Sequence, residues 1–122
     1  MKEVKSSYLG SCHCNKVSFE IYTSSVFQGL YKCNCSLCLK KSIIMKPVSE
    51  NFFFLIKGKE FLSLYQWNKR IAEHYFCRFC GIFTHHRRRR DPSQISINFA
   101  CLEIGEITPT LSVEIVDGKG HD

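Results

Sequence analysis

Apolar and polar residues alternate along several short segments of this chain, which is the pattern of a strand with one buried face. Residues 17–21 place Val17, Phe19 and Ile21 between polar neighbours. Residues 52–56 are instead a continuous apolar run, which predicts a strand buried on both faces. The pattern predicts six strands in all, at residues 17–21, 52–56, 61–67, 71–76, 95–101 and 111–115.

Short strands separated by turn residues predict an all-β domain, built as a sandwich or a barrel-like arrangement of sheets. The best helical segment is short, at residues 36–42, with Ser36 as its expected N-cap. We expect residues 1–122 to form a single domain, with loose tails at residues 1–7 and 118–122.

Composition indicates a globular chain, because 44% of the 122 residues are hydrophobic. The sequence has no apolar run of signal-peptide length and none near the roughly 20 residues of a membrane span. We therefore expect a soluble cytoplasmic protein with no membrane partner. Thiols stay reduced in the cytosol, so the eight cysteines favour metal binding over a disulfide framework.

The pair Cys77 and Cys80, followed by Gly81, has the spacing of a zinc knuckle. In a knuckle, a tight turn points two thiolates at one ion, and glycine relieves the backbone at the end of the turn. A closed site needs two more ligands, and Cys12 and Cys14 can supply them. These four cysteines are predicted to hold a structural zinc ion.

The segment CNCSLC carries three more cysteines, Cys33, Cys35 and Cys38, without a fourth partner cluster. Catalytic zinc sites keep three protein ligands and one open position. Three thiolates around Zn²⁺ leave a charge of −1, which suits a soft ligand such as another thiol better than the generation of hydroxide. The triplet is therefore predicted to hold a second, more labile zinc ion.

Other interpretations of the triplet stay open. Cys101 or His85 could close it as a fourth ligand, or it could be a metal-free redox site or ligate an iron–sulfur cluster. Cys101 lies on the apolar side of its predicted strand, which favours a buried inert thiol. His85 and His86 precede the run of arginines and are expected to continue a polar loop.

The net charge of +6 owes much to the four successive arginines at residues 87–90. Such a run is usually solvated, but it could also bind an anionic ligand or nucleic-acid phosphates. No aromatic side chains are interleaved with the arginines, so a base-stacking surface is not expected. Lys32, Lys40 and Lys41 add positive charge beside the triplet.

The segments GSCHC (10–14), YKCNCSLC (31–38) and FCRFCGIFTHH (76–86) resemble the glutathione-dependent formaldehyde-activating enzyme family, which also includes centromere protein V. The resemblance implies an all-β fold of packed antiparallel sheets, described as a β-tent. It implies a structural zinc at Cys12, Cys14, Cys77 and Cys80, and a second zinc at Cys33, Cys35 and Cys38. The family's named activity is the condensation of formaldehyde with glutathione, classed as a carbon–sulfur lyase reaction in reverse.

On this basis we expect the triplet to bind the sulfur of glutathione or a similar thiol and to handle its adduct with formaldehyde or another small electrophile. Glutathione carries two carboxylates, so basic side chains should line its groove. The candidates are Arg87 to Arg90, with Lys40 and Lys41 behind them, and the expected contacts are Arg87, Arg88, Lys40 and Lys41. The alternative is a non-enzymatic zinc module that holds nucleic acid or an acidic partner through the basic run; nucleic acid is the less expected ligand.

Overall fold

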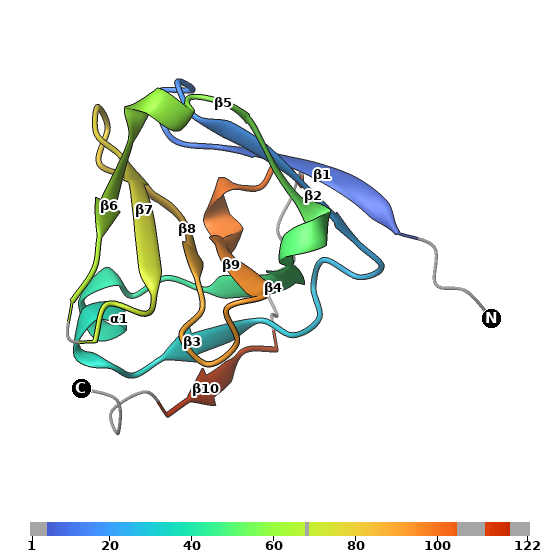
Figure 1. Cartoon of the computed structure of the whole chain (residues 1–122). Helices are drawn as coiled ribbons and strands as arrows, with labels where there is room; N and C mark the ends of the chain where they lie inside the picture. Colours follow the sequence, from blue (N-terminus) through green and yellow to red (C-terminus); the bar gives the residue numbers. More distant parts are fainter. Residues whose placement is uncertain (1–4, 68, 105–111, 118–122) are drawn as a thin grey trace.

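The computed structural model describes residues 5–67, 69–104 and 112–117, which form two β-sheets, one short α-helix and three single turns of 3-10 helix (Figure 1). The smaller sheet has the strand order β1 (Ser6–Ser11), β2 (Ser18–Thr23), β5 (Phe53–Lys57). The larger sheet has the order β10 (Glu114–Val116), β3 (Tyr31–Cys33), β4 (Met45–Ser49), β9 (Gln94–Asn98), β8 (Phe83–Arg87), β7 (Glu73–Cys77), β6 (Leu62–Tyr65).

The prediction of an all-β fold with one short helix is confirmed. The pairing of strands is antiparallel except at one edge, where β10 runs parallel to β3. The helix α1 (Ser36–Lys41) was predicted at the right place but with the wrong cap. Its N-cap is Cys35, whose sulfur accepts a hydrogen bond from the backbone N–H of Cys38, and Ser42 ends it in the left-handed conformation.

Three other expectations need correction. Residues 53–57 form a strand that is buried on one face only, because Phe54 and Ile56 are 49% and 55% exposed. The predicted strand at 95–101 ends at Asn98 and continues as a 3-10 turn, η3 (Phe99–Cys101). Strand β1 begins at Ser6, inside the segment expected to be a loose tail. Residues 1–4 and 118–122, and Leu111 of the last predicted strand, lie outside the described residues.

The main core lies between the two sheets. Phe19 and Ile21 of β2 pack against Val48 of β4 and against Ile95 and Ile97 of β9. Alternate residues of β2 therefore face the larger sheet, as the sequence pattern predicted. Two smaller apolar clusters accompany this core. One contains Cys12 and Cys77, with Cys80 packed against it, and Cys33 packs against the other.

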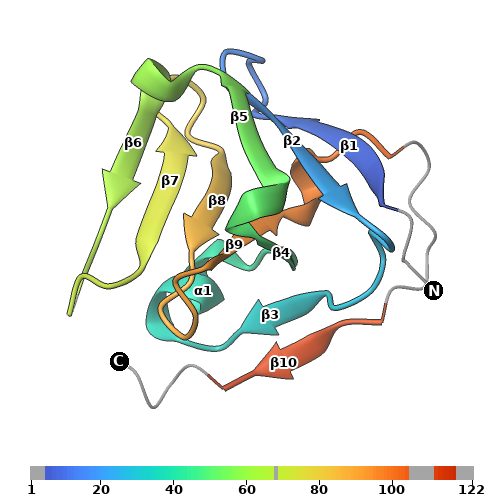
Figure 2. The ribbon, with the colours of Figure 1, turned by 45° about the vertical axis from the view of Figure 1, so that its right-hand side comes forward.

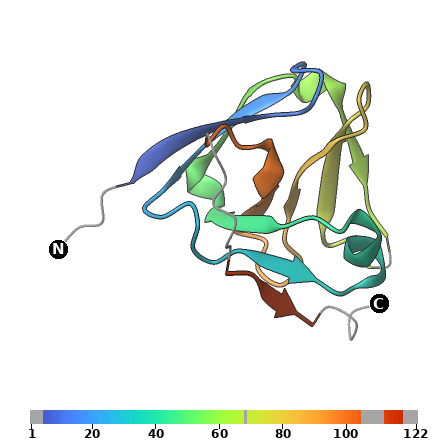
Figure 3. The ribbon, with the colours of Figure 1, turned by 180° about the vertical axis from the view of Figure 1, so that it is seen from behind.

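The chain passes from one sheet to the other at a corner (Figure 2). Strand β5 ends at Lys57, and η2 (Lys59–Phe61) leads directly into β6 of the larger sheet. The β1–β2 and β7–β8 turns lie near the same corner, at the top of Figure 1, whereas α1 lies toward the other end of the larger sheet. Seen from behind, α1 follows β3, beside which β10 runs (Figure 3). Over the described residues, no helix is long and apolar enough to cross a membrane.

Candidate metal centres and pocket

Four cysteine sulfurs meet at the corner between the sheets. Cys12 and Cys14 lie in the β1–β2 turn, Cys77 ends β7, and Cys80 lies in the turn to β8. The Sγ atoms of Cys12 and Cys14 are 3.6 Å apart, those of Cys14 and Cys77 are 3.7 Å apart, and all four lie within 4.8 Å of one another. Tetrahedral zinc with bonds of roughly 2.3 Å needs sulfurs roughly 3.8 Å apart, so this cluster fits a closed four-thiolate site.

The backbone around the four-cysteine cluster brings the sulfurs together. Cys12 and Cys14 do not lie along an extended strand, because Asn15 has a positive φ of 65° and its N–H donates to the carbonyl of Cys12. This tight turn closes the gap that two strand residues at i and i+2 would leave. The N–H of Val17 donates to the sulfur of Cys12 at 3.4 Å. Gly81, with a φ of 76°, ends the knuckle, and its N–H donates to the carbonyl of Cys77.

The triplet lies at the start of α1. Cys33 ends β3, Cys35 caps the helix and Cys38 lies in the first helical turn, with the three sulfurs within 4.8 Å of one another. The N–H of Cys38 donates to the sulfur of Cys35 at 3.4 Å. Among the described residues, no fourth histidine, cysteine or acidic ligand joins this group. Three sulfurs at this separation fit a tetrahedral metal that keeps one position open.

Two thiols of the triplet, those of Cys33 and Cys38, share a hydrogen bond. A hydrogen bond from the Cys38 thiol lowers the pKa of Cys33 to about 5, and the same bond, with burial, raises the pKa of Cys38. The first proton therefore leaves the cluster below neutral pH. A thiolate is the form that binds metal, so the cluster is electrostatically prepared for a cation.

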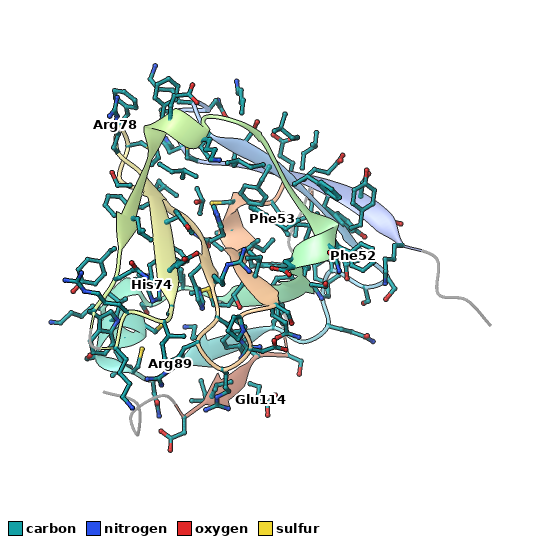
Figure 4. The ribbon with its side chains drawn as sticks, viewed as in Figure 1. Phe52, Phe53, His74, Arg78, Arg89 and Glu114 are labelled. Carbon is teal, nitrogen blue, oxygen red and sulfur yellow. The ribbon has the colours of Figure 1, made fainter. Side chains whose placement is uncertain are left out.

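A pocket opens beside the triplet. It is lined by Cys33, Cys35 and Cys38 together with Tyr31, Trp67, Lys69, Arg70, Ile71, Ala72, His74, His86, Arg88, Arg89, Arg90 and Val116. Figure 4 shows His74 toward the α1 end of β7, whereas Arg78 follows the other end of that strand, next to the four-cysteine cluster. The two cysteine clusters are thus separate sites, and the triplet is the one among them that opens onto this pocket.

Two histidines and a lysine form an array at the pocket. The Nζ of Lys41 lies 3.0 Å from Nδ1 of His74, and the rings of His74 and His86 stack at 4.9 Å. Burial lowers the pKa of His74 to about 3, and the nearby Lys41 ammonium adds to the effect. Burial also lowers the pKa of Lys41 to about 8. Near neutral pH, Lys41 therefore donates to a neutral imidazole, which then carries its proton on Nε2.

The histidines were misjudged from the sequence. His85 and His86 do not continue a polar loop, because they lie in β8 and are only 5% and 7% exposed. The ring of His85 lies between Tyr75 and Phe53, and Cys101 directs its sulfur at the carbonyl of Phe83. Neither His85 nor Cys101 lines the pocket. His86 does, and its Nδ1 is buried with no hydrogen-bond partner among the described residues.

The basic residues expected at the site divide into two groups. Arg88 lines the pocket, as do Arg89 and Arg90 of the same run of arginines. Arg87 points elsewhere and pairs with Glu50, and also with Glu73 at 3.4 Å. Neither Lys40 nor Lys41 lines the pocket, although Lys41 reaches the pocket residue His74.

Sequence reasoning also missed His74, Trp67, Lys69 and Arg70. Part of the pocket lining could have been predicted from the alternation of side-chain direction along β8. His86 of β8 and Arg88, the first residue after the strand, lie on one side of this segment, whereas His85 and Arg87 face the other side.

Over residues 7–115, the sequence matches the protein family described as glutathione-dependent formaldehyde-activating enzyme, GFA. The chain belongs to the GFA family. A crystal structure of a Rhodobacter sphaeroides protein is similar to it with a TM-score of 0.81 and 35% sequence identity, covering 88% of this chain and 99% of that chain. The resemblance inferred from the cysteine motifs is therefore confirmed.

The GFA match spans both cysteine clusters. Membership supports a glutathione-dependent, formaldehyde-activating role, with glutathione as the partner that the family implies. Each cluster can hold a metal ion.

Proposed function

We propose that this GFA protein binds zinc at both cysteine clusters and catalyses carbon–sulfur bond formation between glutathione and formaldehyde at the triplet. One contrast carries the proposal. Four sulfurs close the corner site on themselves, whereas three sulfurs of the triplet open onto a pocket large enough to be lined by fifteen residues. A closed site suits a structural role and an open one suits ligand exchange.

Zinc held at the triplet would offer its open position to a thiol and favour the deprotonated form of that thiol at neutral pH. The sulfur then attacks the carbonyl carbon of formaldehyde, and the electrons of the C=O bond move to oxygen, which takes up one proton. The product is S-(hydroxymethyl)glutathione. The reverse reaction breaks the same C–S bond, which is the sense in which the reaction belongs to the carbon–sulfur lyases.

His74 is the group of this chain that we assign to the oxygen. Lys41 donates to Nδ1 of His74, which leaves an N–H on Nε2 of a ring that lines the pocket. A neutral imidazole held in one tautomer can donate a hydrogen bond to an oxygen as negative charge develops on it. Arg88 is positioned to bind a carboxylate of the substrate from the same pocket.

The proposal is tested by zinc analysis and by kinetics on the same preparations. Two zinc ions per chain are expected, together with formation of S-(hydroxymethyl)glutathione above the spontaneous rate, followed by NMR. Cys35→Ser should lose one zinc ion and the catalysed rate. Cys101→Ser, a change at a cysteine outside both clusters, should keep both. A Cys35→Ser protein that retains the wild-type catalysed rate would contradict the assignment of the triplet.

A further inference from the structure

The pocket at the triplet is strongly positive, and this bears on which thiol it accepts. Five of its lining residues are cationic: Lys69, Arg70, Arg88, Arg89 and Arg90. No aspartate or glutamate is among the described residues that line it. Three thiolates and one Zn²⁺ would together contribute a charge of only −1, so they would offset only a small part of this positive charge.

Two of these arginines donate to uncharged oxygen atoms. Arg88 lies over the ring of Tyr31, with its Cζ 4.7 Å from the ring centroid, and donates to the side-chain oxygen of Gln94 at 2.8 Å. Arg90 donates to the backbone carbonyl of Asp117 at 2.9 Å. These contacts hold the guanidinium groups in place through uncharged acceptors. Two acidic residues lie near them but outside the pocket lining: Asp117 supplies the carbonyl that Arg90 contacts, and hydrogen bonds from Ser93, with a smaller contribution from Arg88, lower the pKa of Asp91.

The neighbouring Arg87 shows the opposite arrangement. It points away from the pocket and pairs with Glu50 and Glu73. Arg87, on the side of β8 that faces away from the pocket, is therefore paired with carboxylates. None of the described residues that line the pocket is acidic. Guanidinium groups that donate to uncharged oxygens and converge on a concave site lined by no carboxylate are typical of a site for an anionic ligand.

Glutathione matches this charge pattern only in part. Its two carboxylates suit the arginines, but its α-ammonium would enter a pocket whose described lining offers several cations and no carboxylate. Buried or part-buried like charges repel more strongly than charges in bulk water. A thiol with anionic groups and without an ammonium matches the pocket better.

We propose that the pocket selects acidic thiols, which carry two or more anionic groups and no cationic group, and that the α-ammonium of glutathione weakens its binding. This inference rests on the proposed function, because it assumes that a thiol binds at the triplet. The anionic groups can be carboxylates or phosphates, since guanidinium groups bind both.

Calorimetric titration of the zinc-loaded protein tests the inference with a matched pair of ligands. N-acetylglutathione carries a neutral acetamide group where glutathione has its α-ammonium. We expect it to bind at least three-fold more tightly, with a difference that shrinks as salt is added. Cysteamine, a cationic thiol, should bind more weakly than neutral 2-mercaptoethanol. Glutathione binding as tightly as its acetylated form, or more tightly, would overturn the inference.

Two further ligands distinguish the kinds of anionic group. Mercaptosuccinate is a small dicarboxylate thiol and coenzyme A is a phosphate-bearing thiol. Tighter binding of either than of glutathione supports the inference and identifies carboxylate or phosphate as the preferred group. Weaker binding of both than of glutathione overturns it.

Three variants connect the selectivity to the pocket. Arg88→Gln and Arg90→Gln should each bring the affinity ratio of N-acetylglutathione to glutathione closer to one. Lys59→Gln makes the same change of charge at an exposed residue of η2, outside the pocket, and should leave the ratio unchanged. If the wild type and the three variants all bind thiols with the same affinity ratio of N-acetylglutathione to glutathione, the proposed selectivity is wrong and the proposed function stands. If no thiol binds at all, both the inference and the proposed function fail.

Discussion

The Sγ of Cys14 lies 3.7 Å from the Sγ of Cys77, although the two residues are 63 positions apart in the sequence. The first belongs to the turn between β1 and β2 of the smaller sheet, and the second ends β7 of the larger sheet. An ion held between them would join the two sheets at their common corner. We therefore expect this ion to contribute mainly to the stability of the fold.

Replacing Cys77 with serine should therefore remove one zinc ion per chain and destabilise the protein. A structural zinc ion binds only the folded chain, so its binding free energy adds to the free energy of unfolding. A decrease of about 3 kcal/mol in that free energy corresponds to a fall in Tm of roughly 10 °C for a domain near this size. Elemental analysis and thermal unfolding measure the two effects. Cys101→Ser is the control and should keep its zinc content. A Cys77→Ser protein with unchanged zinc would contradict a four-cysteine site.

Much of the fold could be predicted from the pattern of apolar and polar residues. The six predicted strands correspond to β2, β5, β6, β7, β9 and β10. The missed strands lack that signal for physical reasons. In β4, buried Lys46 donates through Nζ to two backbone carbonyls, and in β8 the buried positions include a threonine and two histidines. A polar side chain satisfied or stacked inside the protein is indistinguishable, in the sequence, from an exposed one.

The cysteine clusters were predictable and the pocket wall was not. Spacing within each motif brings its own cysteines together, because the turns that join them are local. The distant pairs Cys12–Cys14 and Cys77–Cys80 were joined in the prediction because a closed zinc site needs four ligands. The pocket wall instead combines β3, β7, β8, Trp67 and residues 69–72, which meet through the order of strands in the larger sheet. The sequence could not show that Arg87 and Arg88 lie on opposite sides of one chain segment without first identifying β8 as a strand.

Serine and alanine should have different effects at Cys35, which both caps α1 and belongs to the triplet. Serine is a favourable N-cap, so Cys35→Ser should lose the second zinc while the metal-independent stability changes little. Cys35→Ala should lose the same zinc and a further stability of about 1 kcal/mol. Urea unfolding of both variants, compared after removal of zinc from the triplet, measures the difference. Equal midpoints would show that the cap contributes nothing.

Gly58 is expected to tolerate no side chain. Its φ is +90°, and a Cβ there would lie 2.2 Å from the carbonyl oxygen of Lys16 and 2.8 Å from the Cα of Val17. Both neighbours are backbone atoms of the segment that follows the Cys12–Cys14 turn, so they cannot move aside by a change of rotamer. Gly58→Ala should destabilise the protein by about 3 kcal/mol or more, through strain and overpacking together.

Gly29 is the matched control for Gly58. It also has a positive φ, of 74°, but a Cβ at this position would have Cγ of Pro47 as its nearest neighbour, at 3.9 Å, which is an ordinary contact. Gly29→Ala should therefore lower the free energy of unfolding only by the cost of a positive φ at a residue with a side chain, about 1 kcal/mol. Chemical unfolding midpoints of the two variants provide the measurement. If both lose the same stability, the close approach of Gly58 to the Lys16 backbone is not a constraint.

His85 should make the fold sensitive to acid. Burial, with a smaller contribution from Arg87, lowers its pKa to about 3, against about 6.5 in an unfolded chain. Between these values the unfolded state binds more protons, so stability falls as the pH falls from 6.5 toward 3. One such histidine contributes a slope of at most about 1.4 kcal/mol per pH unit.

The expected loss at His85 can be separated from loss of metal. Denaturant midpoints would be measured between pH 7.5 and 5.5 in excess zinc, with bound zinc followed in the same samples. His85→Gln removes the titrating ring and should give a shallower dependence on pH below about 6.5 while the zinc content matches wild type. Parallel curves for the two proteins would mean that His85 becomes protonated in the folded state without penalty, and that its position between Tyr75 and Phe53 does not exclude the charge.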